Sequence, residues 1–406
     1  MAPNYTGLNS LKVADLKAMI ADKTYGAAGA ANILRESIQR GDTKPEDFRL
    51  AHLFEAFVPN ANELRLEFMS GGLSDGTIAK LREAGEVRNS EFQNITGQIV
   101  YSKTLQYYAD EDFVFTKEVQ EIPSPIQDVE KIAGVSRLGN DVGVVGEGEN
   151  FPDAGPVEDF IHIPAGVKRG EKVTVSWEAV FNDRTGDLLK RCQEVGYFYG
   201  YDKEARIIDS IVDEGTGAKS ILAGGHRYYW RNTSYATHQT STPWDNVTAS
   251  NALVDWTDVE GAELTLSRIV DPNTGLVTLI QPDVVAVTKQ LEYTARYVLQ
   301  ATSLQVNAGG YATSGTVTRM ELANFLPKYR ILTSRLLETR MATDTDWYLG
   351  NFKQAFGYKV NRPMKVDPMP PNSLLEWTNE VVAGWKVSEV GAACVTDPRM
   401  VNESRA

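Results

Sequence analysis

The sequence predicts an α+β fold in which early and late strands pair within one discontinuous core. Apolar residues recur at three- and four-residue steps in residues 10–58, and again over about 30 residues from Asp183 to Glu214. Between these segments, from Val129 to Val180, the dominant period is two, as in a strand with one covered face. The tail from Ile331 alternates short apolar strands with turns.

Composition places the chain in the ordinary globular class. The 406 residues are 42% hydrophobic and 23% charged, which allows two or three domains with real cores. Neither a signal-peptide pattern nor an apolar run of about 18 residues is visible, so we expect a soluble protein made in a cytoplasm, with no membrane partner. The net charge of −13 argues against a primary nucleic-acid binder held by phosphate contacts.

The front of the chain has short helical stripes. One stripe consists of Leu11, Leu16, Met19 and Ile20, and the other of Ile33, Leu34 and Ile38. Gly26 and Gly29 are expected to interrupt them. A third helix fits 45–57. Residues 70–90 are typical of a linker, and 94–115 is expected to be more extended.

A long two-stranded ribbon is expected next. Val173, Val175 and Trp177 alternate with polar residues, and Gly-rich segments at 139–148 and 165–170 supply turns. A ribbon of this kind is marginal in water by itself. We therefore expect it to project from its own subunit and to lie on a neighbour.

A long helix follows the ribbon, with Asp183 as a plausible N-cap and Gly215 as a plausible stop. Its expected buried face is formed by apolar residues, namely Leu188, Cys192, Val195, Tyr199, Ala205, Ile208 and Val212. Gly196 and Gly200 should each cost about 1 kcal/mol in mid-helix unless something packs closely there.

The rear of the chain mixes helices and strands among polar loops. The pattern predicts a helix near 256–266, a turn at 271–275, a strand at 276–280 and a helix from about Asp283 to Tyr293.

Motif inspection predicts no catalytic, cofactor-binding or metal-binding residue, no cofactor and no enzyme activity. Glu214–Ser220 resembles a phosphate loop, but the required glycines fall at Asp213 and Ala218 and the segment follows a helix. Gly143, Gly146 and Gly148 lack the strand-turn-helix context of a dinucleotide site, so a hairpin tip is the better interpretation.

Histidines and cysteines also lack functional spacing; they are His52, His162, His226, His238, Cys192 and Cys394. We interpret His162 as a ribbon side chain and both cysteines as small buried apolar residues. The Asp344–Asp346 segment is interpreted as a solvated turn before Trp347 rather than a cation site.

The order of these features resembles the tailed-bacteriophage major capsid proteins of the Hong Kong 97 fold. The segments that carry the resemblance are Gly146-Glu-Gly148, Val175-Ser-Trp-Glu178 with Asp183, Asp271–Gly275 followed by Gln281-Pro-Asp-Val-Val285, and Trp347–Phe356. The run Leu291–Arg296 after that proline is similar to the Mu-like head-subunit group. The resemblance covers about residues 90–406.

The resemblance implies a division of the chain along the lines of that fold. It comprises a helical N-terminal extension (1–88), an N-arm (89–124), an extended E-loop hairpin (125–181), a spine helix with part of the peripheral domain (182–219), a mainly axial domain (220–330) and peripheral strands (331–406). Some family members join Lys to Asn between subunits. Lys168 and Lys172 are candidates by position only, no Asn partner is identified, and no such site is predicted.

The function implied by the resemblance is structural. Copies would assemble as hexamers and pentamers of an icosahedral head around double-stranded DNA, contacting neighbours through the E-loop and N-arm and binding DNA without sequence specificity. Portal, scaffold or decoration proteins would be further partners, and the location would be the virion, assembled in a bacterial host cytoplasm. Two alternatives stay open: an encapsulin-like cargo compartment, and a hydrolase or carbohydrate-binding module favoured by abundant aromatic residues and Gly/Asn-rich loops.

Overall fold

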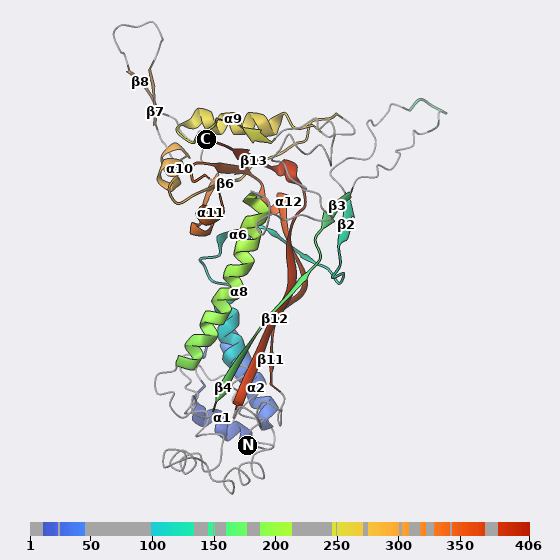
Figure 1. Ribbon diagram of the computed structural model, residues 1–406, viewed down its shortest axis with the longest axis vertical. Helices are drawn as coiled ribbons and strands as arrows, with labels where there is room; N and C mark the ends of the chain where they lie inside the picture. The colour runs from blue at the N-terminus through green and yellow to red at the C-terminus, as the bar shows by residue number, and fades with distance from the viewer. Residues whose placement is uncertain are drawn as a thin grey trace. The chain divides into compact units, whose positions relative to one another are not determined.

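The computed structural model describes about three fifths of the chain. The described residues are 11–22, 25–44, 99–133, 145–148, 150, 160–176, 187–212, 246–248, 250–270, 275–299, 303–307, 317–321, 329–341, 343–369 and 381–406. The expected third helix at 45–57, the expected linker at 70–90 and the segment Glu214–Ser220 lie outside them. The described elements mix helices and strands, which confirms the α+β class (Figure 1).

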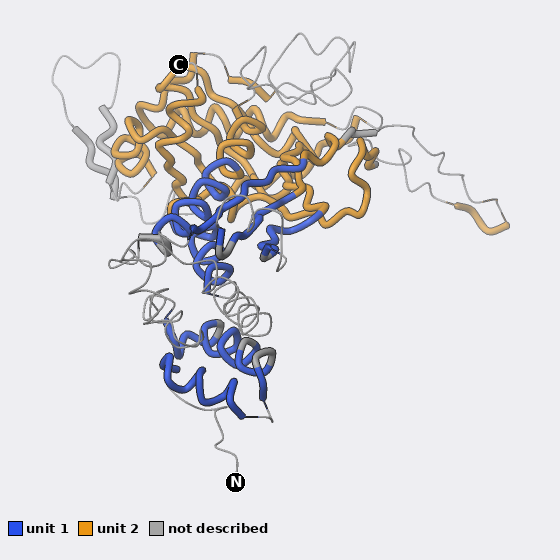
Figure 2. Tube along the Cα trace, turned by 60° about the horizontal axis from the view of Figure 1, so that its bottom comes forward, with its two compact units in different colours: residues 1–111, 168–202, 362–389 blue, residues 112–167, 203–361, 390–406 orange. Residues whose placement is uncertain are grey.

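Two compact units make up the chain, each from several stretches (Figure 2). Unit 1 comprises Met1–Glu111, Lys168–Asp202 and Arg362–Glu389, and unit 2 comprises Asp112–Val167, Lys203–Asn361 and Val390–Ala406. Both units therefore combine early and late segments, as expected for a discontinuous core.

Two short helices pack together near the N-terminus, α1 (Val13–Ala21) and α2 (Gly26–Gln39). Leu16, Met19 and Leu34 are fully buried there. The glycines do not interrupt this pattern as expected: Gly26 begins α2 with a positive φ of 60°, and Gly29 lies inside the helix. Glycine is well suited to that first position because it adopts positive φ without steric cost.

The expectation of an extended segment at 94–115 was wrong, because residues 99–108 form a helix. Its buried residues, Ile99, Val100, Lys103 and Thr104, have helical spacing. A short helix, α6 (Val114–Glu118), follows and leads into strand β1 (Gln120–Pro123).

The long helix is α8 (Asp187–Val212). Five residues of the expected face are buried and Val195 is half-buried, which confirms these six; the five are Cys192, Tyr199, Ala205, Ile208 and Val212. The side chain of Leu188 lies outside the described residues. The proposed start at Asp183 lies outside the described residues. The first part of α8 belongs to unit 1 and the second part to unit 2.

One sheet has the strand order β1-β11-β12-β4, formed with β11 (Phe356–Pro368), β12 (Val381–Val395) and β4 (Val167–Ser176). An early strand, β1, pairs in parallel with β11 through Gln120↔Gly357 to Pro123↔Val360. In the tail, β11 and β12 are 13 and 15 residues long, so the expectation of uniformly short strands was wrong.

The second sheet has the order β5-β13-β10-β6-β9. Its strands are β5 (Val247–Thr248), β13 (Val401–Ser404), β10 (Trp347–Gly350), β6 (Val284–Val287) and β9 (Arg330–Thr333). Strand β6 is buried at every position, as is β10, so the sheet is covered on both faces.

Two expectations for this region were wrong. The run expected as a helix from Asp283 to Tyr293 instead begins with strand β6, and the helix that follows is α10 (Glu292–Leu299). A short, continuous apolar run fits a doubly covered strand as well as a helix. The strand expected at 276–280 is reduced to the isolated bridge Val270↔Val277. The helix expected near 256–266 is confirmed as α9 (Trp256–Ser267).

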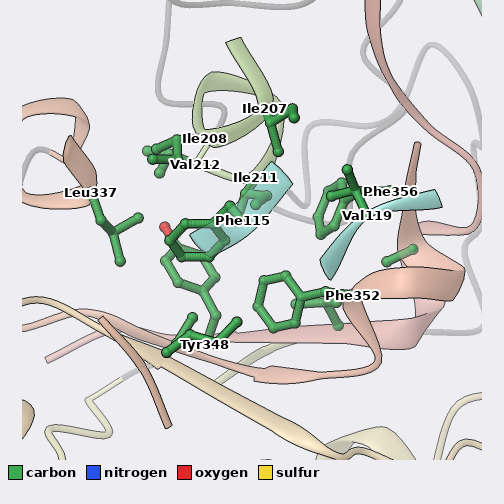
Figure 3. Packing of buried hydrophobic residues seen from close by; sticks show 14 of the residues in the cluster. Phe115, Val119, Ile207, Ile208, Ile211, Val212, Leu337, Tyr348, Phe352 and Phe356 are labelled. Atoms are coloured by element: carbon green, nitrogen blue, oxygen red, sulfur yellow. The ribbon is translucent and has the colours of Figure 1, made fainter. Parts of the chain in front are cut away.

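Side chains on the two faces of β6 and β10 enter different hydrophobic clusters of unit 2. Val284, Ala286 and Tyr348 join a cluster with the end of α8, α6 and helix α12 (Phe352–Ala355). Figure 3 shows Phe115, Tyr348 and Phe352 meeting at its centre, and the rings of Phe115 and Phe352 lie 6.1 Å apart. On the other face, Val285, Val287, Trp347 and Leu349 pack against α9 and α10. Each fully buried large apolar side chain contributes about 1.5–3 kcal/mol relative to exposure.

Two antiparallel strand pairs form ribbons. Strand β2 (Glu130–Ala133) pairs with β3 (Phe160–Ile163), and β7 (Ser303–Asn307) pairs with β8 (Val317–Glu321). The first pair confirms strand pairing within the predicted ribbon. In β4, Val173 and Val175 are more buried than Lys172 and Thr174, which confirms the alternation.

Candidate functional site

The structure places one of the four histidines and both of the cysteines that were considered for possible chemistry. His162 lies on β3 opposite Lys131. Burial raises the pKa of Cys192 and of Cys394 to about 12, which keeps both thiols protonated and unreactive. His52, His226 and His238 lie outside the described residues. Within the described ranges, no group of His, Cys, Asp and Glu is arranged to hold a metal ion.

The other two candidate motifs contain turns. Asp344 is part of a turn before β10, as expected, whereas Asp346 is buried rather than solvated. The Asp346 carboxylate accepts hydrogen bonds from the Thr343 hydroxyl at 2.8 Å and from the Ala406 amide at 2.9 Å. At the Gly-rich tip, Glu147 and Gly148 form an exposed turn with φ +88° at Gly148, in agreement with the hairpin-tip interpretation.

The base of the β2–β3 ribbon contains a network of polar side chains around a buried lysine. Lys359 on β11 has a fully buried side chain, and its Nζ donates to the Asp128 carbonyl oxygen at 2.9 Å. The same Nζ lies 3.4 Å from Oε2 of Glu130, the first residue of β2. Ser124 Oγ donates to that Oε2 at 2.6 Å. The Ser124 hydrogen bond, followed by Lys359, holds the pKa of Glu130 below its ordinary value, so the carboxylate is charged at neutral pH.

Asn361 holds the loop before β2 by its amide. Its Nδ2 donates to the carbonyl oxygens of Ser124 at 2.9 Å and of Ile126 at 2.6 Å. Gly166, after β3, packs closely against the same residue: a Cβ at Gly166 would lie only 1.9 Å from Asn361 Oδ1. The Gly166 amide also donates to the Gln127 carbonyl at 2.7 Å. Both ends of the segment from 124 to 167 are therefore attached to β11 of the same unit.

Around this base, apolar side chains remain uncovered. Ile126 is 49% exposed, Val129 42% and Val167 52%. Polar contacts therefore hold the base to its own unit, whereas its apolar side chains stay available for another surface.

A second polar site fastens the segment before β1 to α8. Glu204 is fully buried, and its carboxylate accepts from the backbone amides of Phe115 at 2.8 Å and Thr116 at 2.7 Å. The Thr116 hydroxyl donates to it as well, at 2.6 Å. The two backbone donors, Phe115 and Thr116, lie in the first turn of α6, where amides lack partners inside the helix. Burial raises the pKa of Glu204, although the hydrogen bonds to Thr116 and Phe115 oppose that shift.

Tyr358 supports the same connection from β11. The Lys203 ammonium lies 4.6 Å from the centroid of the Tyr358 ring and 3.2 Å from the carboxylate of Glu121 on β1. Arg206 donates to the Tyr358 hydroxyl at 2.8 Å. These contacts order α6 and β1 against α8 and β11.

The sequence reasoning missed Lys359, Asn361 and Glu204. The sequence could have indicated a buried carboxylate at Glu204, because this residue lies three and four positions before the buried Ile207 and Ile208 and thus on the same helix face. Lys359 had a weaker one, as a cation within the apolar run Phe356–Val360. Nothing local distinguishes Asn361 from a surface residue.

Comparison with known proteins connects this architecture to one family. A family model described as phage capsid protein matches residues 165–401, more than half of the chain. No match was found among curated protein sequences. No described helix is long and apolar enough to cross a membrane.

Three solved structures illustrate the similarity at low identity. The capsid of a native GTA particle has 12% identity and a TM-score of 0.46, covering 73% of this chain and 90% of that chain. A virus-like particle from Pyrococcus furiosus has 13% identity and a TM-score of 0.40, with 75% and 97% covered. The mature capsid of bacteriophage PhiM1 has 14% identity and a TM-score of 0.39, with 72% and 86% covered. The family assignment rests on the match over 165–401.

Proposed function

The chain belongs to the phage capsid protein family and is a subunit of a phage head shell, and we propose that it assembles as hexamers and pentamers of an icosahedral head. The resemblance to phage capsid proteins drawn from the sequence is thereby confirmed. The family match over 165–401 carries the proposal, since it spans α8, β11 and β12.

The proposed contacts between subunits involve the hairpin at 125–181, the E-loop of the expected division. Its base is fixed by Lys359 and Asn361, while Ile126, Val129 and Val167 expose apolar surface. A two-stranded ribbon gains little stability alone. Lying across an adjacent subunit would cover that surface, and the rigid base would set the direction of the hairpin.

We assign the segment at 89–124 to the N-arm and its end to the site around Glu204. Three hydrogen bonds to one buried carboxylate hold α6 at a defined place on α8. An arm with a fixed end reaches a neighbour with less loss of conformational entropy than a free one. We also propose the rest of the expected division: the N-terminal extension at 1–88, the spine helix with part of the peripheral domain at 182–219, the mainly axial domain at 220–330 and the peripheral strands at 331–406.

The head would enclose double-stranded DNA without reading its sequence, and particles would assemble in the bacterial host cytoplasm. A net charge of −13 suits this role because it keeps attraction to the packaged polymer weak. Portal, scaffold and decoration proteins are the further partners that such a head would engage.

Expression of the chain alone tests the proposal. Sedimentation and negative-stain microscopy should show uniform closed shells or their capsomers. Deleting residues 139–156, with a short turn closing the gap, should leave a folded subunit that forms no closed shell. Monodisperse monomers of the full chain would contradict the proposal, and normal shells from the deletion would contradict the role of the hairpin.

The family match favours this role over a hydrolase or a carbohydrate-binding module. An encapsulin-like compartment would make shells as well. Particles purified from a producing host separate the two, because a phage head contains nuclease-protected duplex DNA whereas a cargo compartment contains a folded enzyme.

A further inference from the structure

One sheet face of unit 1 is basic although the chain as a whole is acidic. Lys168 and Lys172 on β4 are exposed, and the described part of the chain supplies neither with a salt-bridge partner. Lys365 on β11 and Lys386 on β12 are 64% and 61% exposed, and both lie near a single carboxylate, that of Asp367, at 2.5 and 3.7 Å. We call Lys168, Lys172, Lys365 and Lys386 the lysine face.

Side-chain alternation places the two lysines of β4 together, on the side away from α8. The intervening residue Arg169 points the other way, since it forms a 3.1 Å salt bridge with Asp202 of α8. Residues at even positions of β4 must therefore point away from that helix, because successive strand side chains alternate between faces.

Strand β12 contributes Lys386 to the same face. Val387 packs with Tyr199 of α8, so its neighbour Lys386 points away from the helix. A Cβ on Gly170 would lie 3.7 Å from Ser388 Cβ, which shows that the even positions of β4 and β12 share one side. Lys365 joins them through the Asp367 carboxylate that it shares with Lys386. These strand positions place four lysines and one aspartate on the same face of the sheet.

The chain contains a segment of complementary charge. Residues 138–167 hold six acidic residues and no Lys or Arg: Asp141, Glu147, Glu149, Asp153, Glu158 and Asp159. Glu147 is exposed at the described turn of the tip. The segment is the distal part of the hairpin 125–181, which the proposed function lays across a neighbour.

We propose that the lysine face of one subunit receives the acidic hairpin, residues 138–167, of a second copy. This inference rests on the proposed function and names the surface on which the hairpin lies. Each exposed ion pair contributes little alone, but a closed shell repeats the same contact in every subunit, so small contributions add. Duplex DNA is the weaker candidate, because a chain of net charge −13 repels phosphates elsewhere on its surface.

A carbodiimide that couples carboxylates to amines in direct contact tests the geometry. Shells are assembled from a mixture of ¹⁴N- and ¹⁵N-labelled subunits, so that mass spectrometry recognises crosslinks between different copies. We expect mixed-isotope peptides that join 138–167 to one or more of the four lysines. Inter-subunit crosslinks from 138–167 only to other lysines would overturn the inference.

Charge reversal tests the energetics. Lys168→Glu with Lys172→Glu reverses the sign of the face and should lower shell yield at least about tenfold, while circular dichroism of the subunit stays unchanged. Adding Glu147→Lys and Glu149→Lys to the same chain should restore most of the yield. The matched control is Lys117→Glu with Lys353→Glu, which makes the same charge change at two exposed lysines of α6 and α12 in unit 2.

The outcomes separate the inference from the proposed function. A wild-type chain that forms no shells refutes the proposed function and the inference with it. Normal wild-type shells with an undiminished yield for the lysine reversal overturn the inference alone. So does a reversal that leaves shell yield intact but abolishes binding of duplex DNA to capsomers, because the face would then contact DNA.

Discussion

Gly196 of α8 lies directly against the backbone of Thr104: a Cβ at Gly196 would be 2.3 Å from the Thr104 carbonyl oxygen. The expected cost of a glycine in mid-helix is therefore offset by close packing between α8 and residues 99–108. Thr104 Oγ1 hydrogen-bonds its own helix at Val100 O, 2.8 Å away, so Thr104 itself is held in place. The neighbouring backbone has little room to move.

Gly196→Ala should therefore destabilise the subunit, by about 1–3 kcal/mol from overpacking, although alanine is the better helix former. Gly261→Ala in α9 is the matched control, since the nearest atom to its Cβ would be at an ordinary 3.8 Å. That change should stabilise by up to about 1 kcal/mol. Thermal unfolding of both variants checks the pair, and equal effects would mean that the α8 contact is not tight.

Glu204→Gln should loosen α6, because the amide group has one acceptor oxygen where the carboxylate has two for three donors. We expect a loss of about 1–3 kcal/mol at neutral pH and faster hydrogen exchange in 114–118. Glu260→Gln, at an exposed glutamate of α9, is the control. Unchanged exchange in 114–118 would show that the carboxylate does not hold α6.

The pH dependence of the wild type should differ from that of Glu204→Gln in a defined direction. The folded pKa of Glu204 is raised above its ordinary value of 4.5, so its titration contributes stability below that pH and loses it as pH rises through the folded value. The difference between wild type and variant should therefore shift in favour of the wild type as pH falls. Parallel curves of melting temperature against pH would contradict this assignment.

Glu130→Gln should destabilise the hairpin base more than Lys359→Met does. In Glu130→Gln, the buried Lys359 ammonium loses its carboxylate and keeps only the Asp128 carbonyl as a partner among the described residues. In Lys359→Met, the buried charge itself is removed, and the partly exposed Glu130 keeps its hydrogen bond from Ser124. Denaturant midpoints compare the two variants. A larger loss from Lys359→Met would mean that packing of the lysine stem outweighs its charge.

Acid should weaken the same base. The folded pKa of Glu130 is lowered, so its contribution is present above the ordinary value of 4.5 and is lost as pH falls through the folded value. After correction for the intrinsic pH dependence of amide exchange, residues 124–133 should lose protection through that window in the wild type, whereas their protection should stay constant in Glu130→Gln.

The pair α1 and α2 should be ordered mainly by assembly. Among the described residues, its contacts include the Leu11 amide donating to Thr43 Oγ1 at 3.0 Å and the Ser37–Thr43 hydroxyl pair at 2.6 Å. Helices of this length gain most of their stability from docking. We expect residues 1–88 to be retained in shells, with 11–44 strongly protected from exchange there and weakly protected in free subunits.

Peptides from the end of α8 provide the internal reference, because Ile207, Ile208 and Ile211 are fully buried within the subunit. They should be protected in both states. Equal strong protection of 11–44 in both states would identify an autonomous domain and contradict the assembly role. Intact mass of shell subunits checks that the segment is retained.

The sequence by itself determined the elements whose periodicity is long and regular. The buried stripe of α8, the period-two alternation of β4 and the helix α9 all follow from side-chain spacing, which local backbone geometry imposes on any sequence with one covered face. The tertiary structure decided the rest. Val284–Val287 became a strand because clusters cover both of its faces, and a short apolar run is compatible with either a helix or a strand. Lys359, Asn361 and Glu204 became anchoring residues because they meet partners 88 to 237 positions away, and separations of that size are set by folding and leave no spacing in the local sequence.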